Sequence, residues 1–276
     1  MPSPDQPIPQ AQTPSKRSLH RNRRFATPRT IFALMLREVS TRYGDTPGGY
    51  LWAVVEPLGM ILTLSIAFSL LLRAPSLGES FILFYATAYL PFSLFQNLSN
   101  TILRALNFSK PLLQYPAVTW IDAVLARFFL NTLTSVFVSY VMLVVILIFT
   151  DTRNVLLMPN IIGAFVLAMV MGLGVGVLNC ALRGLFNAWD NIWSIFTRPL
   201  FLASAIFYIV EDLPRFTQDI LWYNPLVHIT GLSRTGFYLT YAPDYISIPY
   251  VLFFSLICLV LGLLLLGRFH RDILNR

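Results

Sequence analysis

Long apolar windows, separated by short polar stretches, make up most of the sequence after residue 49. Each window comes close to the ~20 nearly uncharged residues that an α-helix needs to cross the hydrocarbon core of a bilayer. The pattern therefore predicts an all-α membrane protein whose transmembrane domain, residues 29–276, contains six transmembrane helices. The six windows are residues 50–72, 81–103, 121–149, 156–182, 192–210 and 249–267.

Residues 29–43 carry a different pattern. Ile31, Leu34 and Met35 recur at helical spacing beside Arg37 and Glu38, so the segment is too short and too charged to span. This pattern predicts an amphipathic helix that lies in the membrane surface. Residues 1–28 are polar, basic and rich in proline, with no apolar stretch typical of a signal peptide. We expect them to form a disordered tail in the cytosol.

Residues 211–248, between the last two windows, mix proline, aspartate and aromatic residues. Asn224 followed by Pro225 predicts the start of a short helix, because asparagine caps helices and proline suits the first helical position. The apolar residues that follow suggest a helix half-buried in the outer leaflet. His228 is the only histidine outside the terminal regions, and a lone histidine on a short helix is more often structural than a ligand.

The distribution of basic residues predicts the orientation. The connections between successive windows are numbered from the amino terminus. Of the 20 lysines and arginines, only Arg73, Arg153, Arg215 and Arg234 fall in or next to the odd-numbered connections. The other 16 fall in or next to the tails, the surface helix and the even-numbered connections. Positively charged residues favour the cytosolic side of a membrane. Both termini are therefore expected in the cytosol, with the protein in a bacterial inner membrane.

Composition narrows the classes of function. Apolar residues make up 56% of the chain and charged residues 12%, which is far from a soluble domain. The net charge of +7 then reflects membrane topology and does not indicate nucleic-acid binding. No hydrolytic triad, zinc-ligand spacing or sugar-nucleotide motif is present, and Cys180 and Cys258 are expected to be core residues. We expect no catalytic residue, no metal and no cofactor bound by this chain.

An energy source must come from elsewhere. A P-loop requires a lysine in G-x-x-x-x-G-K-[ST], but Lys16 lies in the tail and Lys110 precedes a proline. Any ATPase must be a separate polypeptide that binds ATP and Mg²⁺ itself. The compact stretch 104–116 is expected to dock it, the alternative being an ordinary cytosolic loop. The candidate docking residues are Arg104, Lys110, Pro111, Leu112, Leu113 and Tyr115.

Several residues near or inside the windows are candidates for lining a canal. Glu56 lies two turns inside the first window, where a carboxylate needs a partner or water; it either pairs with an arginine or contacts substrate. Trp189 and Trp193 share one helical face, which is either an interfacial belt or a stacking surface for sugar rings. The candidate canal residues are Arg37, Arg42, Tyr50, Trp52, Glu56, Trp189, Trp193 and Arg198.

Two motifs carry a family resemblance. The run from Arg37 to Gly44, followed by Gly49-Tyr50-Leu51-Trp52-Ala53 and Glu56-Pro57, resembles the amino-terminal signature of type-2 ABC permeases that export polysaccharides. Asn224-Pro225-Leu226-Val227-His228, with Ser233-Arg234, resembles the signature before their last helix. In detail the sequence is most similar to the capsular polysaccharide export permeases of Gram-negative bacteria.

The resemblance implies an assembly and a substrate. In that family two permease chains and two nucleotide-binding ATPase chains form the transporter. The resemblance implies a coupling helix in residues 104–116. It implies re-entrant helices before the last span, and these include Asn224, Pro225, His228 and Arg234. It also implies that the substrate is an acidic, lipid-linked capsular polysaccharide. It also implies a periplasmic co-polymerase and outer-membrane export proteins as partners. Exporters of O-antigen, teichoic acid, lipids or drugs with the same fold, a membrane-embedded glycosyltransferase and a non-transporting scaffold are the alternatives.

Overall fold

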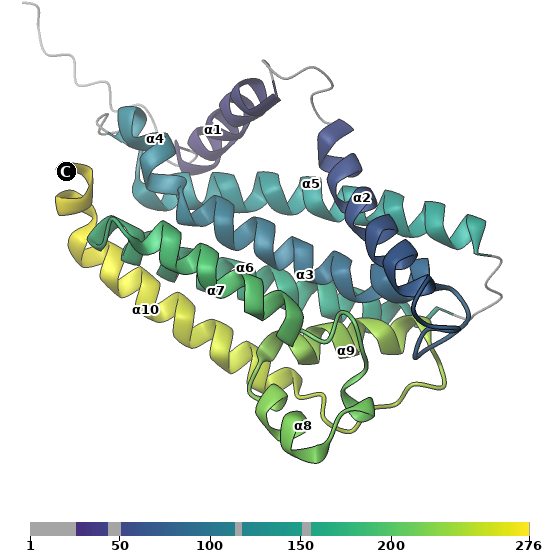
Figure 1. Ribbon diagram of the computed structural model, residues 1–276. Coiled ribbons are helices and arrows are strands. Elements are labelled where there is room, and N and C mark those ends of the chain that lie inside the picture. Colours follow the sequence, from purple (N-terminus) through teal and green to yellow (C-terminus); the bar gives the residue numbers. More distant parts are fainter. Residues whose placement is uncertain (1–25, 44–50, 114–117, 151–155, 276) are drawn as a thin grey trace, which may run out of the picture.

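In the computed structural model, residues 26–43, 51–113, 118–150 and 156–275 are described, and every regular element among them is helical (Figure 1). Residues 1–25, 44–50, 114–117, 151–155 and 276, which include most of the predicted tail, lie outside this description. The elements are α1 (Ala26–Tyr43), α2 (Leu51–Ser69), α3 (Phe81–Leu103), α4 (Ala105–Leu113), α5 (Trp120–Phe149), α6 (Met158–Leu185), α7 (Trp189–Ala203), the 3-10 turn η2 (Val210–Asp212), α8 (Arg215–Trp222), α9 (Pro225–Phe237) and α10 (Ile248–Asn275).

Within the described segments, five helices are long and apolar enough to cross a membrane. They are α2, α3 with α4, α5, α6 and α10, and they correspond to five of the six predicted windows. Several ends are fixed by local chemistry. The hydroxyl of Thr119 and the carboxylate of Asp122 form a capping box at the start of α5.

The predicted fifth window, residues 192–210, forms the 15-residue helix α7, which ends at Ala203. A helix of that length is about 22 Å long, short of the ~30 Å hydrocarbon core. It ends early because Ala205 takes a positive φ of 54° and the next carbonyls are held by another helix. Arg234 of α9 donates to the carbonyl oxygens of Ile206 and Tyr208, at 2.9 and 2.7 Å. The predicted end near residue 210 was wrong.

Helix α6 lies at the centre and packs against α3, α9 and α10. Gly172, Gly174 and Gly176 permit this close approach. A Cβ at Gly172 would come within 2.8 Å of Leu98 on α3, and one at Gly174 within 2.4 Å of a backbone oxygen of α10. Cys180 and Cys258 are buried free cysteines, as expected.

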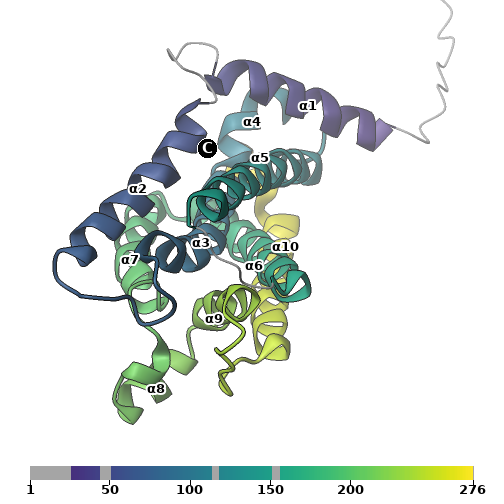
Figure 2. The same ribbon diagram turned by 90° about the vertical axis from the view of Figure 1, so that its right-hand side faces the viewer.

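The two ends of the molecule differ. Helices α1 and α4 and the carboxyl end of α10 lie at one end, whereas α8 lies at the other (Figure 1). Figure 2 shows α1 lying across the bundle beside α4 and α5, as a surface helix would. The same view shows α2 standing at the side, away from α6, α9 and α10. Few residues of α2 are buried, so one of its faces has no neighbour within the described chain.

Helix α9 begins where the sequence predicts. The Asn224 side chain accepts a hydrogen bond from the Leu226 amide at 3.1 Å, and Pro225 occupies the first helical position. The expectation of a half-buried helix was wrong, because twelve of its 13 residues are buried inside the protein, against α6 and α3. Its polar residues bond inward: the Ser233 hydroxyl donates to the carbonyl oxygen of Thr87 on α3 at 2.6 Å.

Candidate functional site

Polar side chains form a stripe along one face of α3. Ser93, Gln96, Asn97, Asn100 and Arg104 recur at spacings of three and four residues and therefore share a helical face. The stripe occupies the carboxyl-terminal half of a helix that is mostly apolar and deeply buried. Polar groups in a membrane helix are costly to expose to lipid. This stripe must face water, protein or a polar substrate.

Three pockets follow the stripe. The first, of about 330 Å³, lies between α2, α3 and α5. The second, of about 390 Å³, lies between α3 and α7, and the third, of about 570 Å³, lies toward α4. Asn100 lines all three, Asn97 lines the first and third, and Arg104 lines the second and third. The three pockets are therefore neighbours along α3, and together we call them the α3 groove.

The wall from α2 and α5 is rich in hydroxyls. Thr134, Ser135 and Ser139 of α5 face the first pocket, and the Asn97 amide donates to the Ser135 hydroxyl at 2.7 Å. Glu56, on α2, is the only charged residue that lines this pocket, and its side chain is exposed. The surroundings suit hydrogen bonding to a hydroxylated substrate. The structure places Glu56 at this pocket, and its role as a canal residue stays a prediction.

The wall from α7 carries both charge and an aromatic ring. The Trp193 indole N–H donates to the Asn100 side-chain oxygen at 2.8 Å, which positions that ring at the groove. Arg198 and Asp190 line the same pocket, and Asp190 forms an ion pair with Arg183 of α6 at 2.6 Å. Trp189, one turn earlier on α7, donates to the Asn179 side-chain oxygen at 3.0 Å and lines none of the three pockets. Of the two predicted tryptophans, only Trp193 borders a groove pocket.

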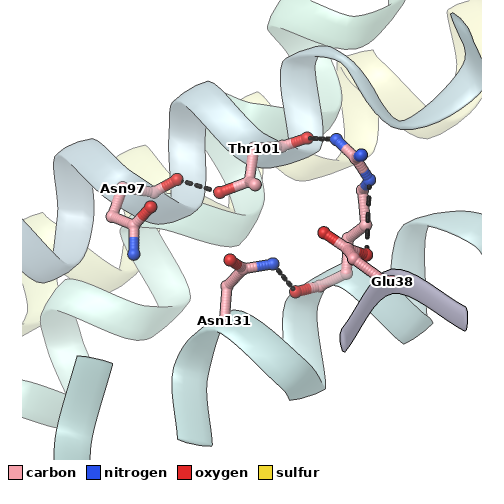
Figure 3. Close-up of polar contacts among 5 residues, drawn as sticks. Glu38, Asn97, Thr101 and Asn131 are labelled. Carbon is pink, nitrogen blue, oxygen red and sulfur yellow. Dashed lines mark hydrogen bonds and ion pairs between the residues drawn. The ribbon is translucent and has the colours of Figure 1, made fainter. Parts of the chain in front are cut away.

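A buried ion pair closes the groove near α4 (Figure 3). Glu38 of α1 lies 3.6 Å from the Nε of Arg127 on α5, and both side chains are less than a tenth exposed. Arg127 also donates to the carbonyl oxygen of Thr101 on α3 at 2.7 Å. Its guanidinium lies 4.2 Å above the ring of Phe108 on α4. One side chain thus joins α1, α3, α4 and α5.

The predicted docking residues occupy the end of α3 and the short helix α4. Arg104 is exposed and faces the groove, whereas Lys110, Leu112 and Leu113 are half-buried and Pro111 is exposed. Leu113 packs partly against the protein's own core. Arg104 and Pro111 are therefore the exposed positions among the described members of the predicted set. Tyr115 lies outside the described residues.

The outer residues predicted from the sequence build a rigid junction. The Ser247 amide donates to His228 Nδ1 at 3.1 Å, so the ring proton lies on Nε2, which donates to the Trp222 carbonyl at 2.8 Å. Burial lowers the pKa of His228 and keeps the ring neutral. Arg234 is completely buried, with Phe84 4.2 Å below its guanidinium. Both residues hold α8, α9 and the segment after α7 together.

The remaining canal candidates do not line the three groove pockets or lie outside the described residues. Arg37 lies over the Phe108 ring at 5.4 Å, next to the groove end, and Trp52 is exposed at the start of α2 without lining a groove pocket. Tyr50 and the side chain of Arg42 lie outside what the structure describes. The sequence analysis did not identify two features of the site, the polar stripe on α3 and the ion pair between Glu38 and Arg127. The stripe could have been found from its polar residues at helical spacing inside an apolar window.

No group of three His, Cys, Asp or Glu side chains suited to a metal occurs among the described residues. What the arrangement offers is a groove with many polar side chains beside the carboxyl-terminal half of α3, with arginines at the α4 end. Such a groove can form hydrogen bonds with a hydrated, hydroxylated solute.

Comparison with known proteins decides the family. The family model for ABC-2 type transporters matches residues 29–238. The chain belongs to the ABC-2 type transporter family. It is a membrane transport subunit and not an enzyme.

Similar ABC-2 transporter subunits include the polysialic acid transport protein KpsM of Escherichia coli, which is 29% identical over 86% of this chain and 92% of that protein. The capsule polysaccharide export inner-membrane protein CtrC of Neisseria meningitidis serogroup A is 27% identical over 89% of this chain and 92% of its own length. The capsule polysaccharide export inner-membrane protein BexB of Haemophilus influenzae is also 27% identical, over the same shares.

Proposed function

We propose that this ABC-2 subunit exports an acidic, lipid-linked capsular polysaccharide across a bacterial inner membrane. The α3 groove is the observation that carries the proposal. Asn, Gln, Ser and Thr side chains can exchange hydrogen bonds with sugar hydroxyls, and the mainly polar lining of the first pocket does not suit a drug or a free lipid chain. The KpsM, CtrC and BexB proteins, named for capsule or polysialic acid transport, support the same class of substrate.

Two copies of the chain would form the complete canal. The first groove pocket is open, Glu56 at its edge is exposed, and α2 leaves one face uncovered. A second copy related by a two-fold axis would present the same groove to the first and enclose a path between them. A homodimer would also shield the groove face of α7 from lipid, because the partner copy would cover it. The short helix α7 could then border a polar path.

The arginines at the α4 end suit an anionic chain. Arg104 and Arg198 are exposed at the pockets, and Arg127 and Arg183 line the third pocket while paired with carboxylates. Clustered positive charge raises the local concentration of an anionic polymer or its phosphorylated end. This placement, together with the positive-inside distribution, supports an orientation with α1, α4 and both termini in the cytosol and α8 outside.

ATP hydrolysis would come from two copies of a separate subunit that bind ATP and Mg²⁺ and dock on α4. Movement of α4 would be transmitted through Phe108 to Arg127, and from there to α1 and α5. A periplasmic co-polymerase and outer-membrane export proteins would receive the polymer beyond α8.

The test of the function uses the purified chain with and without its cognate ATPase subunit. We expect no ATP turnover by the chain alone, turnover by the complex, and a rise in turnover when acidic capsule polymer is added. Neutral O-antigen polysaccharide and detergent-solubilised lipid are the controls. A complex that responds only to one of these controls would assign the chain to a different exporter class. Turnover by the isolated chain would overturn the need for a partner.

The orientation gives a separate prediction. In a chain with Cys180 and Cys258 replaced, a cysteine at the exposed residue Asp219 of α8 is expected to react with a membrane-impermeant maleimide added outside spheroplasts. One at the exposed Pro111 of α4 is expected to react only after the membrane is permeabilised. Labelling in the reverse order would refute the placement of both termini in the cytosol.

A further inference from the structure

A separate pocket, of about 320 Å³, lies at the end of the molecule away from α4. Its wall is formed by Gln218, Asp219, Trp222 and Tyr223 of α8 and the following turn, and by Tyr245 of the segment before α10. Buried valines from η2 and α9 form its floor. The volume is at the lower end of the ~300–1,000 Å³ typical of small-molecule sites. It has the size for one or two rings and not for a folded polymer.

Aromatic rings supply flat surfaces in this pocket. The Trp222 ring packs on Tyr250 at 4.9 Å, and Tyr223 stands perpendicular to it at 5.6 Å. Trp222 remains 37% exposed and Tyr223 71% exposed, so both rings have surface available to a ligand. The apolar C–H face of a sugar ring can lie on such a surface, while its hydroxyls point to polar groups at the rim.

The polar groups at the rim are mainly acceptors. The Asp219 carboxylate is exposed and accepts only. The Gln218 amide N–H already donates to the carbonyl oxygen of Leu213 at 2.7 Å, which leaves its oxygen. The Tyr245 hydroxyl lies 3.2 Å from that of Tyr241 and is turned inward. A ligand that brings donors, as hydroxyls do, therefore suits this rim, where the Tyr223 hydroxyl can also donate and the Asp219 carboxylate would repel a carboxylate.

Membrane contact does not account for the pocket, because α8 has a different face for it. Phe216 and Ile220 are one turn apart and 77% and 56% exposed, and they form an apolar surface suited to lipid. Gln218, Asp219 and Trp222 lie on the pocket face of the same helix. A carboxylate inside an aromatic site for lipid chains would be costly.

We propose that this outer pocket binds an uncharged, hydroxyl-rich sugar ring of the polymer as it leaves the canal. The proposal rests on the proposed export function and adds a specific contact at the exit. Exposed Glu211, Asp212 and Asp244 lie in the neighbouring segments and add further negative charge at this end. The acidic sugars of the polymer are repelled here, whereas they are attracted at the α4 end. The charge at this end of the molecule thus favours binding of an uncharged sugar ring over a charged one.

The test uses the full chain in lipid nanodiscs and saturation-transfer-difference NMR. The probes are the neutral disaccharides cellobiose, maltose and N,N′-diacetylchitobiose, the acidic disaccharide of α2,8-linked sialic acid, and choline as a cationic control. We expect transfer to ring protons of at least one neutral disaccharide. Tyr223→Ala should weaken this binding about five- to tenfold. Asp219→Asn should also weaken it, and should raise binding of the acidic disaccharide.

Phe216→Ala, on the lipid face of α8, is the matched control and should leave sugar binding unchanged. Equal transfer in wild type, Tyr223→Ala and Asp219→Asn would overturn the proposal, as would binding of choline in preference to every sugar. The outcome is separate from the export test, because a subunit that stimulates no ATP turnover with capsule polymer could still bind the disaccharide. A complex that exports normally but shows no Tyr223-dependent binding would refute the pocket alone.

Discussion

Replacing Arg127 with alanine is expected to lower the free energy of unfolding by about 3–5 kcal/mol, because removal of one partner leaves a buried charge unpaired. The Glu38 carboxylate loses its ion pair, the Thr101 carbonyl loses a donor, and Phe108 of α4 loses the cation above its ring. The measurement is thermal unfolding of the purified chain in detergent. A shift of several degrees is expected, at ~2–4 °C per kcal/mol.

The double variant Glu38→Leu with Arg127→Met separates the charge from the packing. Replacing a buried ion pair with apolar groups of similar volume is often neutral or stabilising, so this variant should recover most of the lost stability. Arg271→Ala, exposed near the end of α10, is the control and should change stability by less than about 0.5 kcal/mol. If the double variant is as unstable as the single one, the ion pair is not what joins α1 to α5.

The double variant also tests whether movement of α4 is transmitted to α1 and α5 through Phe108 and Arg127. It should fold and still bind the ATPase, yet export poorly, since Phe108 would no longer contact a cation that also holds α1. The readout is capsule at the cell surface in a strain whose only copy is the variant, with permease abundance measured in parallel. Normal export by the double variant would show that α4 acts through other contacts.

The substitution Asn100→Asp is expected to reduce export of an acidic polymer about tenfold or more without loss of protein. The carboxylate keeps an acceptor for the Trp193 indole N–H, so the local structure should persist. It also places a negative charge at the one residue common to all three groove pockets. Repulsion between two unit charges at ~4 Å is about 1–4 kcal/mol between bulk water and a protein surface. The measurement is surface capsule per cell.

A matched control introduces the same negative charge at a position outside the groove. Asn191→Asp lies on the same short helix as Trp193 but is exposed and lines none of the three pockets. It should export at the wild-type level. Equal loss in both variants would indicate a general effect of charge on α7 and α3, and unchanged export in Asn100→Asp would remove the α3 groove from the path of an acidic polymer.

Local pattern predicted most of the helices. The predicted window 81–103 coincides with α3, and the capping residues Asn224 and Pro225 begin α9 where expected. These features depend on residues within one or two turns, which the sequence displays directly. The absence of a P-loop lysine and the motifs around Arg37, Glu56 and Asn224 likewise needed no tertiary information.

The grouping of the groove residues depended on contacts between distant segments. The sequence by itself determined the class of protein, the five helices long enough to span a membrane and the start of α9, because hydrophobicity and capping act locally. Only the tertiary structure decided that α7 ends at Ala203, that α9 is buried, and that Glu38 meets Arg127. These depend on which face each helix turns toward its neighbours, and a single helix has several faces of similar hydrophobicity until packing selects one.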